Sequence, residues 1–203
     1  IRIIFDQTDC LVIGGGFAGL HAALRLADAG RDVVLLEKNI CGGSSSGRSA
    51  GFLTPNSEED FQRLISEHGK EKALTIYKIP SKGVELIVET AQKNGFQCDF
   101  RKQDSLYFSN KVSHNSQIID EAEELAAHHI PHRLLHKKDL KKIHPGKNYM
   151  EGVIYPGCYG INTFAYCQEM KKLLLAKGVR IYENSEVHAL EGNSAKTHLG
   201  SVK

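Results

Sequence analysis

The sequence predicts an α/β fold built around a parallel sheet, and three observations point to it. Residues 9–14 are a short apolar run that ends in glycine, which is typical of a buried parallel strand. Residues 17–29 carry apolar side chains at helical spacing, and Gly30 stands where helices commonly end. Residues 32–37 are a second apolar run, so residues 9–38 predict one βαβ unit with a right-handed crossover.

The composition is that of an ordinary soluble globular protein. The chain has 203 residues, of which 41% are hydrophobic and 25% charged, with a formal net charge of +2. We expect no nucleic-acid partner, because such proteins show a basic stripe with interleaved aromatic residues; the Lys-rich stretch at 137–142 fits a solvated helix face better. We also expect no transmembrane segment, since no apolar run approaches the roughly 18 to 20 residues that a span needs. No signal peptide is visible.

Cysteine and histidine usage predicts neither disulfides nor a metal site. The five cysteines are Cys10, Cys41, Cys98, Cys158 and Cys167. Their odd number and the absence of a CxxC pair argue against a disulfide framework and a Cys-based zinc site. A reducing, cytoplasmic location is expected, with attachment to the periphery of a membrane left open. His128, His129 and His132 have no acidic or Cys partner at ligand spacing, so we interpret them as surface histidines.

Helices and strands alternate along the rest of the chain. Residues 58–94 are expected to be mostly helical, with breaks at Gly69 and Pro80. Further strands are expected as a short pair within 97–108, at 151–155, within 179–190 and from Thr197 onward. Further helices are expected at 116–129, at 138–145 and at 163–177, the last capped by Asn162 and closed by Gly178.

The turn between the first strand and the first helix carries the strongest motif. Residues 14–19 read Gly-Gly-Gly-Phe-Ala-Gly, which satisfies G-x-G-x-x-G in its proper place between a strand and a helix. Gly14 allows the tight turn, Gly16 lets the backbone approach a pyrophosphate, and Gly19 lets the helix pack close to the strand. Phe17 and Ala18 stand at the helix N-terminus, whose free N–H groups favour a phosphate. These positions predict a dinucleotide cradle.

An acidic residue completes the motif at the end of the second strand. Glu37 lies about 20 residues beyond the glycines, where a carboxylate accepts hydrogen bonds from ribose hydroxyls, and Lys38 follows it. The motif alone leaves FAD and NAD equally open.

The loop after the second strand is dense in glycine and serine. One interpretation of residues 42–51 is a flexible linker. However, residues 45–52, Ser-Ser-Gly-Arg-Ser-Ala-Gly-Phe, resemble the aSGRnaGf segment of the glycine/D-amino acid oxidase family of FAD enzymes. In that family this segment lies along the flavin, so the resemblance implies six flavin contacts: Ser46, Gly47, Arg48, Ser49, Ala50 and Gly51.

One of these positions, Ser49, departs from the family, and another, Arg48, has two interpretations. Ser49 stands where many members of the family carry Asn. Arg48 would either raise the electron affinity of the flavin as a nearby cation or hold the loop by hydrogen bonds.

A second segment extends the resemblance. Residues 152–190 resemble the part of the family sequence that returns to the FAD domain, although residues 161–163 read Ile-Asn-Thr where the family often has vdP. By this resemblance Val187 becomes an adenine contact, an assignment compatible with a plain core position. Residues 197–202 resemble the next hairpin of the family, cut short.

The resemblance implies an FAD/NAD(P)-binding Rossmann-like domain with part of a mixed β-sheet substrate domain. It covers nearly the whole chain but only the first half or so of the family's length, so the chain is expected to be truncated. The FAD-binding domain is expected at 1–80 and 160–203, with a partial substrate-binding domain at 81–159.

The function implied by the resemblance is oxidation of a small-molecule amine or amino acid. In the family a hydride passes from the carbon bearing nitrogen to the flavin, with FAD as cofactor. No catalytic acid, base or nucleophile is identified in these residues. Tyr107 and Tyr159 are candidates for the substrate side, with packing as the alternative interpretation. The identity of the substrate and the oligomeric state stay open.

Three alternatives remain. The first is a non-amine flavoenzyme on the same fold; a disulfide reductase would need a redox CxxxxC, whereas Cys41 stands alone. The second is a binding protein that keeps the cradle without catalysis. The third is an NAD-dependent dehydrogenase, in which the loop at 42–52 has no evident role. Analogy of fold does not decide among them.

Overall fold

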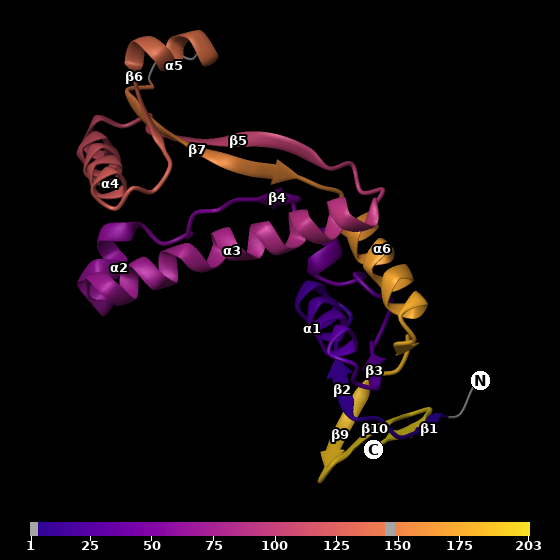
Figure 1. The fold of residues 1–203 in the computed structure, drawn as a ribbon. Coiled ribbons are helices and arrows are strands. Elements are labelled where there is room, and N and C mark those ends of the chain that lie inside the picture. Colours follow the sequence, from indigo (N-terminus) through magenta and orange to yellow (C-terminus); the bar gives the residue numbers. More distant parts are fainter. Residues whose placement is uncertain (1–3, 145–148) are drawn as a thin grey trace. The chain divides into compact units, whose positions relative to one another are not determined.

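The chain divides into two compact units. A computed structural model describes residues 4–144 and 149–203. Unit 1 comprises the chain up to Gly51, Asn94–Asp99 and Ile161–Lys203, and unit 2 comprises Phe52–Lys93 and Phe100–Gly160 (Figure 1). The first boundary thus falls after Gly51 and differs from the expected boundary near residue 80. The physical reason is that residues 61–77 bury their apolar side chains in the core of unit 2.

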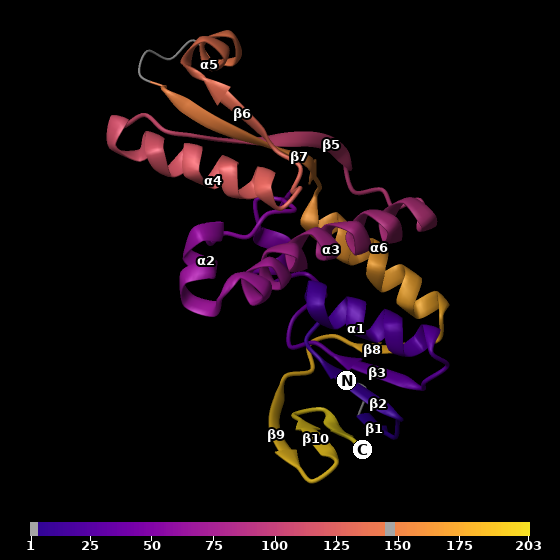
Figure 2. The same ribbon diagram turned by 60° about the vertical axis from the view of Figure 1, so that its left-hand side comes forward.

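Unit 1 is built on the predicted βαβ unit. The strands β2 (Cys10–Ile13) and β3 (Val33–Leu36) pair in parallel, and β8 (Arg180–Tyr182) extends the sheet on the other side of β3. All four side chains of β3 are buried, as expected for a central strand. Figure 2 shows α1 (Phe17–Asp28) lying along this sheet. The βαβ unit predicted at residues 9–38 is therefore confirmed.

The ends of the two helices in unit 1 follow from local chemistry. The helix α6 (Thr163–Ala176) begins at Asn162, whose side-chain oxygen accepts the N–H of Ala165 at 3.0 Å. Gly30 and Gly178 follow α1 and α6 with φ of +75° and +84°, a backbone conformation that glycine adopts without strain. These three predicted positions are confirmed.

A second sheet packs against β3. Its strands are β1 (Ile4–Asp6), β11 (Gly200–Val202), β10 (Ser194–Thr197) and β9 (Val187–Glu191), in that spatial order. Here β1 runs parallel to β11, and the other described pairs are antiparallel. Ala195 and Val202 pack on Val34 and Leu36 in one buried cluster.

The strand expected across 179–190 is interrupted. Between β8 and β9 the chain turns at Asn184, which has a φ of +53° and whose N–H donates to the carbonyl of Asn39 at 2.8 Å. The N–H of Ser185 donates to the carbonyl of Glu37 at the same distance. These bonds hold the turn against the loop after β3, at the point where the chain leaves the first sheet and enters the second.

The sheet of unit 2 is organised around one long strand. The strand β7 (Glu151–Gly160) pairs antiparallel with β5 (Arg101–Phe108), β6 (Arg133–His136) and β4 (Phe52–Leu53). The strand pair expected within 97–108 is therefore wrong: β5 is a single strand, because β7 offers it a partner along its length. The pairing of β5 with β7 shifts its register between Gln103 and Ser105.

Helices cover this sheet. They are α2 (Phe61–His68), α3 (Lys70–Asn94), α4 (Asn115–Ala127) and α5 (Lys137–Ile143). Pro80 lies inside α3, so the predicted break there is wrong. Proline removes one backbone hydrogen bond, but side chains before it (Tyr77) and after it (Val84) are buried and hold the helix together.

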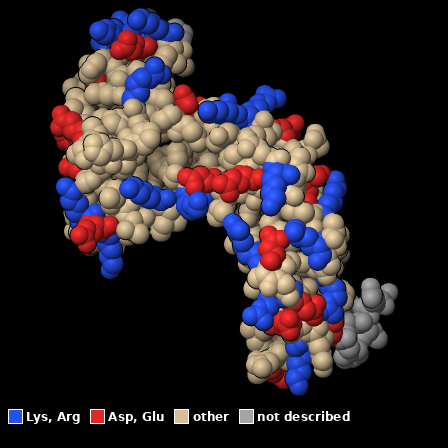
Figure 3. Space-filling model, viewed as in Figure 1, with Lys and Arg blue, Asp and Glu red and all other residues tan. Residues whose placement is uncertain are grey.

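Charged side chains of both signs are interspersed on the visible surface (Figure 3). The lysines of α5 are exposed at the top of this view while Leu140 beneath them is buried, so the Lys-rich stretch is a solvated helix face, as predicted. Within residues 4–144 and 149–203, no helix combines the length and the apolar character that crossing a bilayer requires.

Candidate functional site

The candidate site lies in unit 1, where the carboxyl ends of β2, β3 and β8 meet. Ligands of open α/β sheets bind at this edge, beyond the ends of the strands. The loops that follow the three strands enclose a cavity of about 350 Å³. It is lined by Ile13, Gly14, Gly16, Leu36, Glu37, Lys38, Gly42, Gly43, Ser44, Ser45, Ser46, Ser185, Glu186 and Val187.

The glycine motif forms the floor of this cavity. Gly14 has a φ of +104°, which a side chain would strain. A Cβ on Gly19 would lie 1.9 Å from the carbonyl oxygen of Gly14, so only glycine lets α1 approach the strand this closely. A Cβ on Gly16 would meet the hydroxyl of Ser46 at 2.7 Å. The turn and the helix packing have the roles that the motif predicts for them.

The N-terminus of α1 is poised for an anion. The helix begins at Phe17, and its first turn contains no acidic residue. The N–H of Phe17 donates to Ser46 Oγ at 3.1 Å, while Ala18 is exposed. Free N–H groups and the positive end of the helix dipole favour a phosphate at this position.

Glu37 is the buried acidic residue of the site. Only 7% of its surface is exposed. Its Oε2 accepts the N–H of Gly15 at 2.6 Å and its Oε1 accepts the N–H of Asn39 at 2.8 Å. A carboxylate has about four acceptor positions, so two remain for hydroxyl groups of a ligand. Lys38 beside it is exposed at the cavity wall.

The Ser-Gly-Arg loop is held by its glycines. A Cβ on Gly47 would lie 2.0 Å from the carbonyl oxygen of Gly42. Gly51 has a φ of +79°, and a Cβ there would lie 2.1 Å from the carbonyl oxygen of Ile161. The loop is therefore fixed by close backbone contacts and is no flexible linker.

The remaining loop residues point to solvent. Arg48, Ser49 and Ala50 are exposed. Ser49 Oγ accepts the N–H of Gly51 at 3.4 Å. In the part of the chain that the structure describes, the guanidinium of Arg48 makes no hydrogen bond or ion pair, so it does not hold the loop.

The thiol closest to the motif has low reactivity. Cys41 is fully buried beside Gly15. Burial and, after it, the nearby Glu183 carboxylate raise the pKa of the Cys41 thiol to about 12. Burial raises the pKa of Cys167 to about 11. Redox thiols work as thiolates, so this environment disfavours disulfide chemistry here.

The structure gathers some of the predicted residues and leaves others outside the cavity. Those lining the cavity are Gly14, Gly16, Glu37, Lys38, Ser46 and Val187. Those outside its lining are Phe17, Ala18, Gly19, Gly47, Arg48, Ser49, Ala50 and Gly51. Sequence reasoning missed the other lining residues, although the position of the last two just before Val187 could have indicated them: Ile13, Leu36, Gly42, Gly43, Ser44, Ser45, Ser185 and Glu186.

Unit 2 contains two cavities of its own. One of about 650 Å³ is lined in part by Tyr77, Tyr155 and Tyr159, and Tyr159 also stacks on Phe100 with ring centroids 4.8 Å apart. The other, about 580 Å³, includes Tyr107. Among the described residues, no three His, Cys, Asp or Glu side chains are arranged to hold a metal ion.

Comparison with known proteins identifies the family. Residues 9–202 match the family described as FAD dependent oxidoreductase, DAO. The chain belongs to this family. FAD is thus the dinucleotide to which its cradle corresponds.

Curated relatives are longer than this chain. It is 31% identical over 183 residues to the probable oxidoreductase OrdL of Haemophilus influenzae, covering 90% of the chain and 42% of that protein. It is 37% identical over 93 residues to gamma-glutamylputrescine oxidoreductase of Escherichia coli, covering 46% of the chain and 22% of that protein. The chain therefore spans less than half the length of these relatives.

Solved structures show the same fold. The L-amino acid deaminase of Proteus vulgaris superposes with a TM-score of 0.79 at 20% identity, covering 100% of this chain and 47% of that chain. The glycine oxidase of Geobacillus kaustophilus superposes with a TM-score of 0.80 at 17% identity, covering 98% of this chain and 53% of that chain. At these identities the likeness establishes the α/β fold alone.

Proposed function

We propose that the protein takes part in oxidising a small amine or amino acid, with FAD as the hydride acceptor. The observation that carries this proposal is the cradle itself: the glycine turn, the buried Glu37 and the packed Ser-Gly-Arg loop meet at one edge of one sheet. Its family membership adds FAD dependence. Relatives and structural neighbours named for amine or amino-acid oxidation or deamination favour a substrate that bears nitrogen.

The pyrophosphate of FAD, which joins its flavin and adenosine halves, would lie at the glycine turn. The backbone at Gly16 and the N–H groups of Phe17 and Ala18 would bind the phosphates, since Gly16 lines the cavity and carries no side chain of its own. Gly19 contributes by allowing the helix to approach. The Ser46 hydroxyl, which accepts the N–H of Phe17, would adjust to the phosphate or donate to it.

The adenosine end of FAD fits the opposite wall. Glu37 would accept the ribose hydroxyls through its two unused acceptor positions, with Lys38 beside it. Val187, which lines the same cavity and also packs against the buried cluster between the two sheets, would contact the adenine. The two interpretations of Val187 are thus compatible.

The flavin end is assigned to the Ser-Gly-Arg loop. Residues 47–51 would lie along the ring system, with small side chains and glycines that permit close approach. The exposed cation of Arg48 is free to stabilise negative charge on a bound ligand, because no partner in the described residues neutralises it. When bound, FAD supplies the oxidation chemistry, and the chain supplies orientation and electrostatics.

The proposal assigns roles to the two units and a compartment to the protein. Unit 1 would be the FAD-binding part and unit 2 part of the substrate-binding domain, with Tyr107 and Tyr159 at its cavities. We also propose that the protein works in a reducing compartment such as the cytoplasm, because all five cysteines are free thiols and four of them are buried.

The test is the visible absorption spectrum of the purified protein with FAD, before and after anaerobic addition of pooled amines and amino acids. A flavin spectrum that bleaches is the expected result, and dividing the pool then identifies the substrate. A spectrum that does not bleach would move the function to a non-amine substrate. Absence of flavin binding, even with added FAD, would contradict the proposal and favour a non-catalytic or NAD-binding protein.

A further inference from the structure

Two side chains from distant parts of the sequence form hydrogen bonds with the backbone of Cys41, in the loop after β3. Oε1 of Glu183, just beyond β8, accepts the backbone N–H of Cys41 at 2.8 Å. Nε2 of Gln168, on α6, donates to the backbone carbonyl of Cys41 at 2.7 Å. Both polar main-chain groups of Cys41 are therefore satisfied by side chains that lie more than 120 residues away in sequence, by 142 and 127 residues.

A third side chain, that of Lys171, holds the Glu183 carboxylate in place. Nζ of Lys171, one turn after Gln168 on α6, lies 2.7 Å from Oε2 of Glu183. The two side chains are 26% and 21% exposed, so solvent screens this pair less than it screens the surface pairs. Burial opposes ionisation of Glu183, but the hydrogen bonds from Lys171 and from the Cys41 N–H outweigh it and hold the pKa of this carboxyl below its usual range.

Cys41 and its neighbour Gly42 contact the glycine turn. The N–H of Gly42, next to Cys41, donates to the carbonyl of Gly15 at 2.8 Å. A Cβ on Gly15 would lie 2.8 Å from the sulfur of Cys41, so the thiol lies directly against this glycine. Gly15 in turn donates to Glu37. A continuous chain of contacts therefore leads from Glu183 through Cys41 to the dinucleotide cradle.

We propose that Glu183, held by Lys171, is a positioning residue for the cofactor. Glu183 is not itself among the residues that line the cavity. It acts by fixing Cys41, and through Cys41 the Gly15 peptide and the cavity-lining pair Gly42–Gly43, in the geometry that receives FAD. This inference rests on the proposed function.

The test compares FAD affinity among matched variants of the protein. Glu183→Ala removes the acceptor for the Cys41 N–H and should raise the Kd for FAD by about tenfold or more, the effect expected for one lost charge-assisted hydrogen bond. Glu183→Gln keeps an oxygen that can accept this N–H and should restore much of the affinity. Glu169→Ala is the control, because Glu169 lies on the same helix and pairs at 2.6 Å with Lys172, away from the loop.

Three readouts separate positioning from general destabilisation. They are the Kd from quenching of flavin fluorescence, the visible spectrum of the bound flavin, and urea unfolding of the protein without FAD. A Kd that rises in Glu183→Ala, recovers in Glu183→Gln and stays unchanged in Glu169→Ala would support the proposal. An unchanged Kd in Glu183→Ala, with or without lower stability, would overturn it while leaving the proposed function intact.

A second variant covers the case in which Glu183→Ala does not fold. Lys171→Met leaves the Glu183 carboxylate in place but frees its second oxygen, so it should raise the Kd severalfold. An unchanged Kd in a folded Lys171→Met variant would overturn the inference. Failure of the unaltered protein to bind FAD would contradict the inference and the proposed function together.

Discussion

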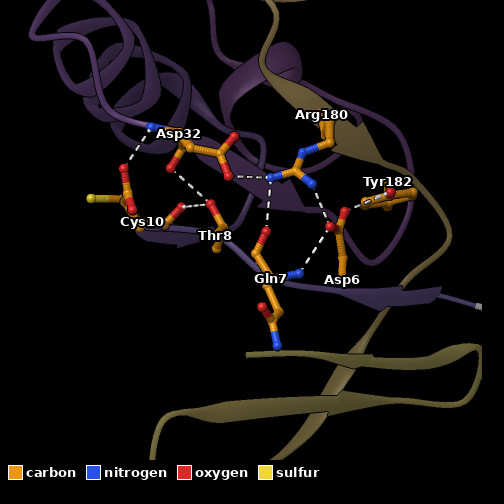
Figure 4. Close-up of polar contacts among 8 residues, drawn as sticks. Asp6, Gln7, Thr8, Cys10, Asp32, Arg180 and Tyr182 are labelled. Atoms are coloured by element: carbon orange, nitrogen blue, oxygen red, sulfur yellow. Dashed lines mark hydrogen bonds and ion pairs between the residues drawn. The ribbon is translucent and has the colours of Figure 1, made fainter.

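The two edges of the parallel sheet in unit 1 use carboxylates in opposite ways. At the amino edge, Arg180 at the start of β8 pairs with Asp6 and with Asp32, whose Oδ2 lies 2.5 Å from its Nη2 (Figure 4). Arg180 also donates to the carbonyl of Gln7 at 2.9 Å, and the hydroxyl of Tyr182 donates to Asp6 at 2.9 Å. At the carboxyl edge, Glu37 and Glu183 accept backbone N–H groups of the loops, and Glu183 also pairs with Lys171.

The difference separates stability from binding. At the amino edge the Arg180 guanidinium pairs with both carboxylates and joins β1 to β8, which ties the four-stranded sheet to the parallel sheet. At the carboxyl edge the carboxylates fix the loops, while the N-terminus of α1 and two acceptor positions of Glu37 stay available. We therefore expect substitutions at the amino edge to change the free energy of unfolding and substitutions at the carboxyl edge to change cofactor affinity as well.

The largest effect is expected from Gly19→Ala at the carboxyl edge. The new Cβ would lie 1.9 Å from the carbonyl oxygen of Gly14, so α1 must move away from β2. We expect the free energy of unfolding to fall by about 3 kcal/mol or more, and FAD binding to be lost. Urea unfolding and flavin fluorescence titration measure the two.

A second glycine provides the control for this variant. A Cβ on Gly83, within α3, would have no heavy atom within 4 Å. Gly83→Ala should therefore raise stability by about 0.5 to 1 kcal/mol, because alanine favours the helix. Equal stability of the two variants would contradict the close helix–strand packing at Gly19.

The next largest effect is expected from Glu37→Ala. The N–H groups of Gly15 and Asn39 lose their acceptor in a buried place, which should cost about 2 to 3 kcal/mol of unfolding free energy. The Kd for FAD should rise as well. Glu191→Ala, which removes only an exposed pair with Lys196, should change stability by less than about 0.5 kcal/mol.

A smaller effect is expected from Arg180→Met at the amino edge. Its side chain is 35% exposed, so loss of the two ion pairs should lower the free energy of unfolding by about 1 to 2 kcal/mol. The Kd for FAD should stay unchanged. A clear loss of FAD affinity in this variant would show that the two edges are coupled and would break the comparison.

The smallest effect concerns cysteine reactivity and leaves stability at neutral pH untouched. Cys41, with a pKa near 12, should resist alkylation in the folded protein at pH 8, whereas the partly exposed Cys10 at the amino edge should react first. Mass spectrometry after timed alkylation gives the order. Fast labelling of Cys41 without unfolding would contradict its burial.

The same thiol has a consequence for pH dependence. Its pKa is raised in the fold from 9.0, so the neutral form is favoured in the native state only. Its contribution to stability is fully present below pH 9 and is lost as the pH rises from about 9 toward 12. A Cys41→Ala variant should lose less stability than the unaltered protein over this interval in urea unfolding.

Features decided by local chemistry could be read from the sequence. The βαβ unit, the end of α1 at Gly30 and the cap of α6 at Asn162 depend on residues within a few positions of one another. The same holds for Gly19, whose packing against Gly14 needs only the strand, the turn and the helix. The two motif residues that line the cavity, Gly14 and Gly16, were predictable for this reason.

Features decided by distant partners could not be read in this way. The break expected at Pro80 does not occur, because side chains on both sides of it are buried in unit 2. The first unit boundary falls after Gly51 rather than near residue 80, because α2 and the start of α3 pack on β7.

The sequence by itself determined the cradle, the family resemblance and the positions of the helix caps, since each depends on short-range spacing. Only the tertiary structure decided how the cradle is held. The glycines of the Ser-Gly-Arg loop pack on the carbonyls of Gly42 and Ile161, and Glu183 reaches Cys41 across 142 residues. Spacing along a chain carries no information about which distant carbonyl or carboxylate will lie within hydrogen-bonding distance once the strands have aligned.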